Sequence, residues 1–401
     1  MIARIYLPLV ILILLTDTYL YRQFIRPRWQ SRWVALAWFA VTVAMIAAAS
    51  DFSTSRDFVP ENATPTLIFL LITGVLYLPK ALIAAGHLTG RGILRMTGRQ
   101  RAAAALPRWG ALVGALFGIL GIYVIVYGIT AGFNKVEVRH VDYSSPQLPE
   151  AFDGYRIALF SDAHVGNYAT GGGTVLDAAV DSMMAMNAGA IFFLGDMQNT
   201  RPSEIEKHKA LLGRLKAPDG IFAILGNHDY AHYMDGTDKE KLGSEAMTKS
   251  ILRGLGWHLL LNEHTMLYHQ ADSIALAGME GNEGQGEDHG YPIWEKTTGG
   301  IADSLFTIML VHNPNYWRKY VIPNDLAQLT LSGHTHGGQV RLMGVSTTTL
   351  IYDEDDGMYE QGDKSLFVTR GIGALIPLRF GVTGEVVLLT LHKKETTHQQ
   401  P

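Results

Sequence analysis

The chain has 401 residues, of which 48% are hydrophobic and 17% are charged, so it is too apolar for a disordered protein. It contains no cysteine, which excludes disulfide scaffolds, thiolate metal sites and cysteine nucleophiles. Residues 1–132 carry 12 Lys and Arg against 4 Asp and Glu, whereas residues 133–401 carry 21 against 33. The larger, acidic part would repel a polyanion, so nucleic acid is not expected as a partner.

Four apolar segments precede residue 134, and we predict that each crosses a membrane. They cover residues 5–21, 33–50, 66–86 and 109–133. A spanning helix needs about 20 mostly apolar residues, and the second and fourth segments come close to or exceed this without a charge. The first contains Asp17, and the third contains Pro79 and Lys80. No span carries the paired interior charges that transport usually needs, which disfavours a transporter.

Arginines determine the predicted orientation in the cell membrane. By the positive-inside bias, segments rich in arginine stay in the cytoplasm. Both termini and the domain that follows the fourth span are then expected outside the cytoplasm. The arginines lie between the first and second spans (Arg22, Arg26, Arg28, Arg32) and between the third and fourth (Arg91, Arg95, Arg99, Arg101, Arg108).

The fourth span also has a small-residue face. Gly110, Gly114 and Gly118 recur at intervals of four residues. This spacing places them on one side of a helix and predicts close packing against a neighbouring helix.

After the spans, we expect a linker at 133–152, a second domain at 153–392 and a flexible tail at 393–401. Strands predicted at 156–161, 190–194 and 221–225 alternate with helices at 175–186 and 203–215. This alternation is typical of helices that cover a mostly buried sheet. Two sheets with helices outside them would accommodate the later strands, at 265–269, 273–277, 306–311, 329–332, 365–369 and 385–391.

Polar residues follow five of these strands at the point where each strand ends. Ligands of α/β folds bind at the carboxyl ends of strands, so we expect these residues to converge. Their nitrogen and oxygen atoms suit Mn, Fe, Zn or Mg. The motifs are Asp162-Ala163-His164, Gly195-Asp196, Gly226-Asn227-His228-Asp229, His312 and Gly333-His334-Thr335-His336.

The order of these motifs resembles that of the calcineurin-like dinuclear metallophosphoesterases, over residues 153–392. Gly-Gly-Gln at 337–339 and Thr-Arg-Gly-Ile-Gly at 369–373 resemble the membrane-associated branch of that family. The resemblance implies an α+β or α/β fold in which a double β-sandwich is flanked by helices. It also implies two divalent metal ions as cofactors.

The resemblance implies a role for each motif residue. His228 would act as an acid on the phosphate or leaving group, and Asp229 would orient it. The second motif departs from the family, because Asn199 stands where relatives often have an acid. The implied ligands are Asp162, His164 and His336 for the first metal, Asn227, His312 and His334 for the second, and Asp196 as the bridge between them.

The expected function is that of a metal-dependent phosphoric ester hydrolase anchored in the membrane. Metal-activated hydroxide would attack a phosphoester or pyrophosphate bond, of a phosphorylated small molecule or of a lipid-linked or envelope substrate. The alternative is a catalytically inactive metal-binding receptor or scaffold of the same fold. Arg370 is expected either to reach a phosphate or to form a structural ion pair. Membrane lipids are expected partners, and the oligomeric state is left open.

Overall fold

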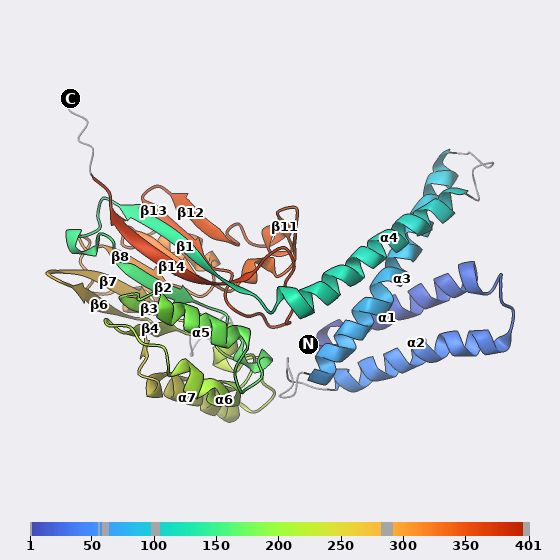
Figure 1. The fold of residues 1–401 in the computed structure, drawn as a ribbon, viewed down its shortest axis with the longest axis horizontal. Coiled ribbons are helices and arrows are strands. Elements are labelled where there is room, and N and C mark those ends of the chain that lie inside the picture. The colour runs from blue at the N-terminus through green and yellow to red at the C-terminus, as the bar shows by residue number, and fades with distance from the viewer. Residues whose placement is uncertain (1, 55–56, 58–63, 98–104, 282–291, 396–401) are drawn as a thin grey trace. The chain divides into compact units, whose positions relative to one another are not determined.

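The computed structural model describes residues 2–54, 57, 64–97, 105–281 and 292–395. The chain divides between Gly128 and Ile129 into two compact units, close to the predicted boundary at residue 132 (Figure 1). The expected tail at 393–401 lies mostly outside the described residues.

The first unit consists of long apolar helices, four of which are long and apolar enough to cross a membrane. Helix α3 runs on to Thr97, so Arg91 and Arg95 lie on the helix and not in a loop. Arg99 and Arg101 fall outside the described residues. Its elements are α1 (Ile2–Leu20), η1 (Tyr21–Ile25), α2 (Arg32–Ser53), α3 (Thr64–Thr97) and α4 (Ala105–Tyr127). The short η3 (Gly128–Gly132) follows α4 and belongs mostly to the second unit.

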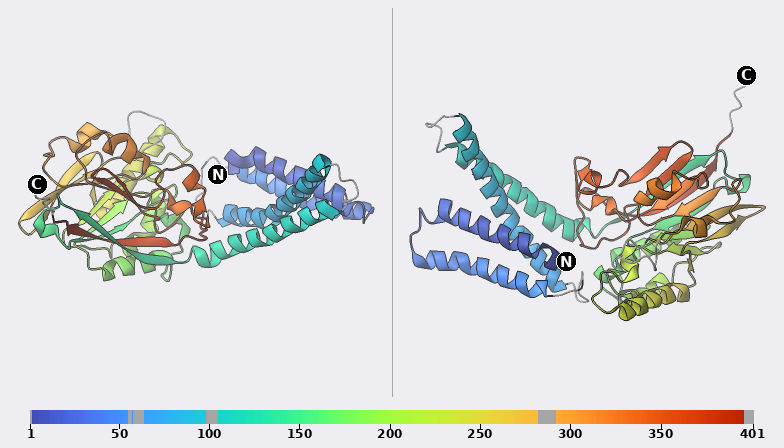
Figure 2. Two further views of the ribbon diagram at one scale, coloured as in Figure 1. Left: turned by 90° about the horizontal axis from the view of Figure 1, so that it is seen from above. Right: turned by 180° about the vertical axis from the view of Figure 1, so that it is seen from behind.

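Helices α3 and α4 pack together through the predicted glycine face (Figure 2). A Cβ atom added at Gly114 would lie 2.9 Å from the Cα of Ile83, and one at Gly118 would lie 2.8 Å from the Cα of Pro79. Such distances leave no room for a side chain. The predicted close packing of this face is therefore confirmed.

The first unit also holds an ion pair that the sequence did not suggest. Lys80 Nζ lies 2.7 Å from Asp17 Oδ1, and the carboxylate is fully buried. The hydroxyls of Thr42 and Tyr77 donate to Asp17 Oδ2 at 2.7 and 2.9 Å. The statement that no span carries paired interior charges was wrong, because the partners belong to helices α1 and α3, which lie far apart in the sequence.

The second unit is built from two six-stranded sheets that face each other. In the first sheet, β1 is parallel to β14, β14 is antiparallel to β2, and β2 to β5 are parallel. Its strand order is β1 (Val136–Ser145), β14 (Gly384–Lys393), β2 (Arg156–Phe160), β3 (Ala190–Leu194), β4 (Ile221–Ile224) and β5 (His258–Leu259).

In the second sheet, the four central strands are parallel and the two outer strands are antiparallel to their neighbours. Its order is β12 (Gly357–Gln361), β13 (Lys364–Val368), β9 (Leu329–Ser332), β8 (Thr307–Leu310), β7 (Asp272–Gly278) and β6 (Glu263–His269). A separate small hairpin pairs β10 (Arg341–Leu342) with β11 (Val345–Ser346).

Three apolar layers hold this unit together. Alternate residues of both sheets, such as Phe192 and Leu310, fill the space between the sheets. Helices α5 (Val175–Ala185), α6 (Pro202–Leu212) and α7 (Asp238–Gly254) cover the outer face of the first sheet (Figure 1). Trp317 and Val321 of η7 (Trp317–Val321) cover the second, beside the short helix α8 (Trp294–Thr298). This is the expected double β-sandwich flanked by helices.

The two longest elements that the sequence analysis did not predict are β1 and α7. Residues 136–145 are not a linker, because they form β1 and pair along their whole length with β14. Helix α7 was not predicted; its sequence has few apolar residues, but a capping box between Thr237 and Glu240 begins it.

Candidate functional site

The five polar motifs meet at one edge of the sandwich. Strands β2, β3 and β4 of the first sheet end just before Asp162, Asp196 and Asn227. Strands β8 and β9 of the second sheet end just before His312 and His334. Because parallel strands point the same way, their carboxyl ends bring these side chains together, as expected.

The first group of side chains contains Asp162, His164 and His336, whose candidate ligand atoms lie within 4.8 Å of one another. His336 Nε2 is 3.8 Å from Asp162 Oδ1. Both ring nitrogens of His164 and Nδ1 of His336 are buried and have no hydrogen-bond partner among the described residues. Buried polar atoms normally have partners, so these nitrogens fit a bound cation.

The second group contains Asp196, His312 and His334, again within 4.8 Å. Asn227 Oδ1 joins them, 3.0 Å from His334 Nδ1. Asp196 Oδ2 lies 3.2 Å from His312 Nε2 and 3.8 Å from His164 Nε2, so one carboxylate touches histidines of both groups. This is the position that a bridging ligand requires.

Backbone carbonyls fix the tautomers of two histidines. Leu194 O lies 2.7 Å from His312 Nδ1, and Asn199 O lies 2.6 Å from His228 Nδ1. A carbonyl only accepts, so each Nδ1 carries a proton, and each Nε2 faces the candidate site. The fit of the second group to a divalent cation therefore includes the carbonyl that orients the His312 ring.

The backbone of the site is strained. Five candidate ligands have positive φ angles, a region that residues other than glycine rarely occupy. A site held in this conformation has its ligands in place before any ion arrives. These residues are Asp162 (50°), His164 (44°), Asp196 (61°), His334 (75°) and His336 (53°).

Burial controls the protonation of the histidines. It lowers the pKa of His334 and of His336 to about 3 and that of His164 well below its ordinary value, so all three rings are neutral and able to bind a cation. Burial acts in the same direction on His312, but the charge of Asp196 outweighs it and raises the pKa of His312 to about 10. A cation binding at His312 must displace that proton.

His228, expected to act as an acid, also lies among the candidate ligands. Its ring packs edge-on against His164, with centroids 4.8 Å apart, and it forms a third cluster with His164 and Asp196. Its backbone N–H donates to Asp196 Oδ1 at 2.8 Å. The ring is therefore close enough either to bind an ion or to meet a substrate beside one.

Asp229 was expected to orient the His228 ring, but among the described residues its carboxylate bonds to backbone groups instead. Its carboxylate accepts the backbone N–H groups of Gly226, Asp196 and Met197 at 2.8 to 3.0 Å and that of Gln198 at 3.3 Å. Burial and the nearby charge of Asp196 raise the pKa of Asp229 to about 7. Asp229 thus shapes the turns that carry Asp196 and Asn227, and the Asn199 carbonyl orients the His228 ring.

Asn199, where relatives often have an acid, contributes through its backbone. Its N–H donates to Glu204 Oε2 at 2.6 Å, and Thr200 and Arg201 donate to the same carboxylate. Glu204 is buried, so a carboxylate from helix α6 supports this turn. Arg370 forms ion pairs with Asp356 (3.0 Å) and Glu137 (3.1 Å), which confirms the structural alternative for that residue.

Three side chains around the site were missed in the sequence. The ring of Tyr233 stacks on His228 with centroids 4.3 Å apart, and its hydroxyl accepts from Asn227 Nδ2 at 3.0 Å. The hydroxyl of Tyr352 lies 2.9 Å from His334 Nε2. The buried Arg379 donates to the carbonyls of His336, Arg370, Gly371 and Gly373. Such contacts carry no local signal in the sequence.

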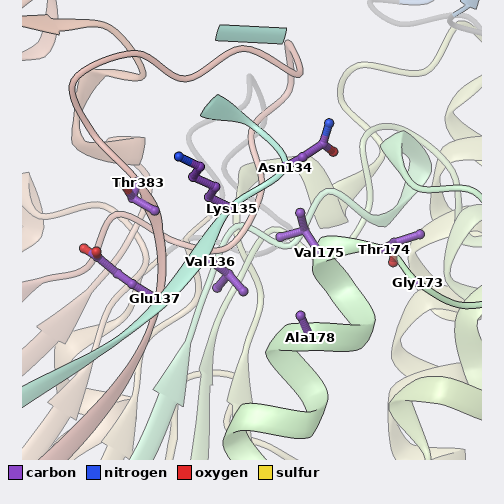
Figure 3. A pocket seen from close by; sticks show the side chains of 9 residues that line it. All are labelled: Asn134, Lys135, Val136, Glu137, Gly173, Thr174, Val175, Ala178 and Thr383. Carbon is purple, nitrogen blue, oxygen red and sulfur yellow. The ribbon is translucent and has the colours of Figure 1, made fainter. Parts of the chain in front are cut away.

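A cavity of about 550 Å³ lies elsewhere in the second unit, beside the start of β1. Figure 3 shows the side chains that line it, among them Val136 of β1 and Val175 and Ala178 of α5. None of the candidate ligands lines it. The cavity is therefore separate from the candidate metal centre, whose side chains are mostly buried.

Comparison with known proteins agrees with this geometry. Residues 155–338 match the calcineurin-like phosphoesterase family. The uncharacterized metallophosphoesterase YkuE of Bacillus subtilis is 32% identical over 69% of this chain and 94% of its own length. A transmembrane protein with a metallophosphoesterase domain from Danio rerio is 27% identical over 68% of this chain and 61% of its own. The uncharacterized metallophosphoesterase Cj0846 of Campylobacter jejuni is 26% identical over 69% of each chain.

The match of residues 155–338 to the family and the 32% identity to a metallophosphoesterase covered over 94% of its length show that this chain belongs to the calcineurin-like metallophosphoesterases.

Proposed function

We propose that the chain is a membrane-anchored phosphoesterase that binds two divalent ions and hydrolyses a phosphoester or pyrophosphate bond. The observation that supports this most strongly is Asp196, whose single carboxylate touches His312 of one ligand group and His164 of the other. When bound, the two ions would polarise the phosphate oxygens and supply the attacking oxygen from water.

The residues of the chain have distinct roles in this proposal. The carboxylate of Asp196 offsets the repulsion between two cations. The neutral rings of His164, His334 and His336 complete the coordination without adding charge. His228 has its Nδ1 proton bound by Asn199 O, so its Nε2 is free to donate to the leaving oxygen when the ring is protonated.

A metal assay on the full chain in detergent tests the assignment of the ligands. Asp196→Asn should lower the content of both ions, because both groups share this carboxylate. Asp181→Asn is the control, since Asp181 is an exposed residue of α5 that pairs with Arg214. Retention of two full equivalents in Asp196→Asn would contradict the bridge.

A second variant tests whether His228 binds a metal ion or acts as a general acid. His228→Ala should keep both ions and lose about 10² to 10⁴ in turnover, the usual contribution of a general acid. The substrates would be soluble phosphomonoesters, phosphodiesters and pyrophosphates, which also identifies the bond cleaved. If His228→Ala loses ions as Asp196→Asn does, His228 is a ligand. If the intact protein with two ions hydrolyses neither these compounds nor a diphosphate lipid in a bilayer, the scaffold alternative replaces the enzyme.

We further propose that the second unit lies outside the cytoplasm. The arginine-rich segments before α2 and before α4 support this orientation, since positive residues favour the cytoplasmic side. A carboxyl-terminal alkaline phosphatase fusion, which is active only after export, should show activity. A carboxyl-terminal fluorescent reporter that folds only in the cytoplasm should stay dark, and its fluorescence would reverse the placement.

A further inference from the structure

An unusual group of apolar side chains is exposed on the small hairpin β10–β11 and the turn that follows it. Among the described residues of the second unit, eleven large apolar side chains are exposed, and five of them lie within residues 342–351. Single exposed apolar residues are common, but a contiguous group marks an interaction site. The apolar hairpin patch consists of Leu342 (51% exposed), Met343 (103%), Val345 (58%), Leu350 (81%) and Ile351 (72%).

The patch is a built structure and not a frayed loop. The hairpin closes through pairing of Leu342 with Val345. Beneath it, Asp355 accepts from Arg341 Nη2 at 2.8 Å and from Thr348 Oγ1 at 3.1 Å. The polar groups at the base are thus bonded to one another, while the apolar side chains point away from the core.

The patch lies at the same edge of the second unit as the exit from the membrane. The last candidate span ends at Gly132, and β1 begins at Val136, which pairs with Gly384 of β14. Just before β14, the Phe380 carbonyl accepts from the Arg341 N–H at 2.8 Å, at the base of the hairpin. The end of β1 that is tethered to the bilayer and the hairpin therefore share one end of the sheet.

A second set of contacts leads from the membrane exit to the hairpin. The ring of Phe133 stacks on Tyr168, with centroids 5.7 Å apart and planes 14° apart. The neighbouring Asn167 donates to the Ala374 carbonyl at 2.6 Å, and Gln339 donates to the Ile376 carbonyl at 2.7 Å. A peptide spans at most about 3.6 Å per residue, so Phe133 cannot lie far from the bilayer surface.

The patch also adjoins the candidate metal centre. Tyr352 follows Ile351 directly, and its hydroxyl lies 2.9 Å from His334 Nε2. Thr335, between the two histidines of the fifth motif, donates to the Asp355 carbonyl at 2.7 Å. A surface that contacts the patch would therefore lie beside the loop that carries His334 and His336.

We propose that the apolar hairpin patch inserts into the surface of the bilayer that anchors the chain and so presents the metal centre to amphiphilic substrates. The occupant is lipid, because the tether keeps a bilayer beside this edge and the exposed side chains are apolar. A lipid carrying a phosphoester or pyrophosphate headgroup would then reach the site without leaving the membrane. This substrate class rests on the proposed function, whereas the lipid contact does not.

The absence of cysteine makes the contact directly measurable. Met343→Cys in the full chain gives a single site for an environment-sensitive fluorophore. The labelled protein would be placed in nanodiscs of phosphatidylethanolamine and phosphatidylglycerol. We expect a blue-shifted emission, quenching by spin-labelled lipids and protection from iodide in water.

Tyr268→Cys provides a matched control. Tyr268 is likewise a large exposed residue (69%), but it lies on β6 at the opposite end of the unit. The next residue, His269, packs on Phe152, which follows the far end of β1. A fluorophore attached to Tyr268→Cys should show the emission of a label exposed to water. A water-like signal at Met343 would overturn the proposal, as would a blue shift seen only in native membranes, which would indicate a protein partner.

An activity measurement tests the substrate class separately. The double variant Met343→Asp, Leu350→Asp should keep its ions and its rate on a soluble phosphoester. Its rate on a diphosphate lipid in the bilayer should fall at least tenfold, and Tyr268→Asp should leave both rates unchanged. If the double variant hydrolyses the lipid as fast as the parent protein does, the patch has no role in substrate access. If the intact protein hydrolyses neither compound, the proposed function fails, and the fluorescence still decides the lipid contact.

Discussion

Tyr233 allows the positioning of one metal ligand to be tested without removing any ligand. Its hydroxyl accepts from Asn227 Nδ2 at 3.0 Å, so the amide must turn Oδ1 toward His334 and the second ligand group. Tyr233→Phe removes this acceptor and keeps the ring. The amide is then free to present its NH2 group, which cannot bind a cation.

The size of the effect follows from the bond that is lost. A neutral, partly buried hydrogen bond contributes about 1 kcal/mol, which is roughly fivefold in an equilibrium constant. Loss of a group that hydrogen-bonds to a metal ligand typically lowers metal affinity about 10- to 100-fold. We therefore expect Tyr233→Phe to lower the affinity for the ion at the second ligand group about tenfold and to leave the affinity at the first group unchanged.

Calorimetric titration of the metal-free full chain with Mn²⁺ measures both affinities. Tyr233→Leu is the companion variant, because it also removes the ring that stacks on His228. It should shift the pH profile of turnover, which Tyr233→Phe should not. The reasoning is refuted if Tyr233→Phe leaves both affinities within about twofold of the parent protein.

Three further changes test other parts of the structure. Gly114→Leu should separate α3 from α4 and lower the melting temperature in detergent, whereas Gly92→Leu, where an added Cβ meets nothing within 4 Å, should be tolerated. Asp17→Asn should destabilise the first unit by about 3 kcal/mol by leaving Lys80 unpaired, and adding Lys80→Met should restore much of the loss in thermal unfolding. Arg379→Lys should weaken the first ion more than the second in metal titration, because one ammonium cannot bond four carbonyls.

The second unit was largely predictable where strands are buried on both faces. Strands such as β3 and β9 have the predicted bounds, because continuous apolar runs end in glycine and polar residues. β1 was missed because it is an edge strand whose residues are mostly exposed or half-buried. Its alternation of Val and charged residues had been assigned to a linker.

The candidate site also contains some features that the sequence predicts and others that it does not. The residues that converge could be predicted, because each follows a strand end and the strands are parallel. The contacts of Tyr233, Tyr352 and Arg379 could not, because they depend on how loops pack in space. The pair of Asp17 and Lys80 was hidden for the same reason, since its partners lie on different helices.

The position of β14 has a consequence for how the protein is made. Strand β14, the last strand along the part of the chain that the structure describes, does not lie at an edge of the first sheet but between β1 and β2, the first two strands of the second unit. Until β14 has left the ribosome, β1 has no partner and one edge of β2 is open. An open edge is a template for pairing with other chains. The nascent second unit must therefore be kept apart from its neighbours until β14 has paired, and a chain cut short before residue 384 leaves that gap permanently unfilled.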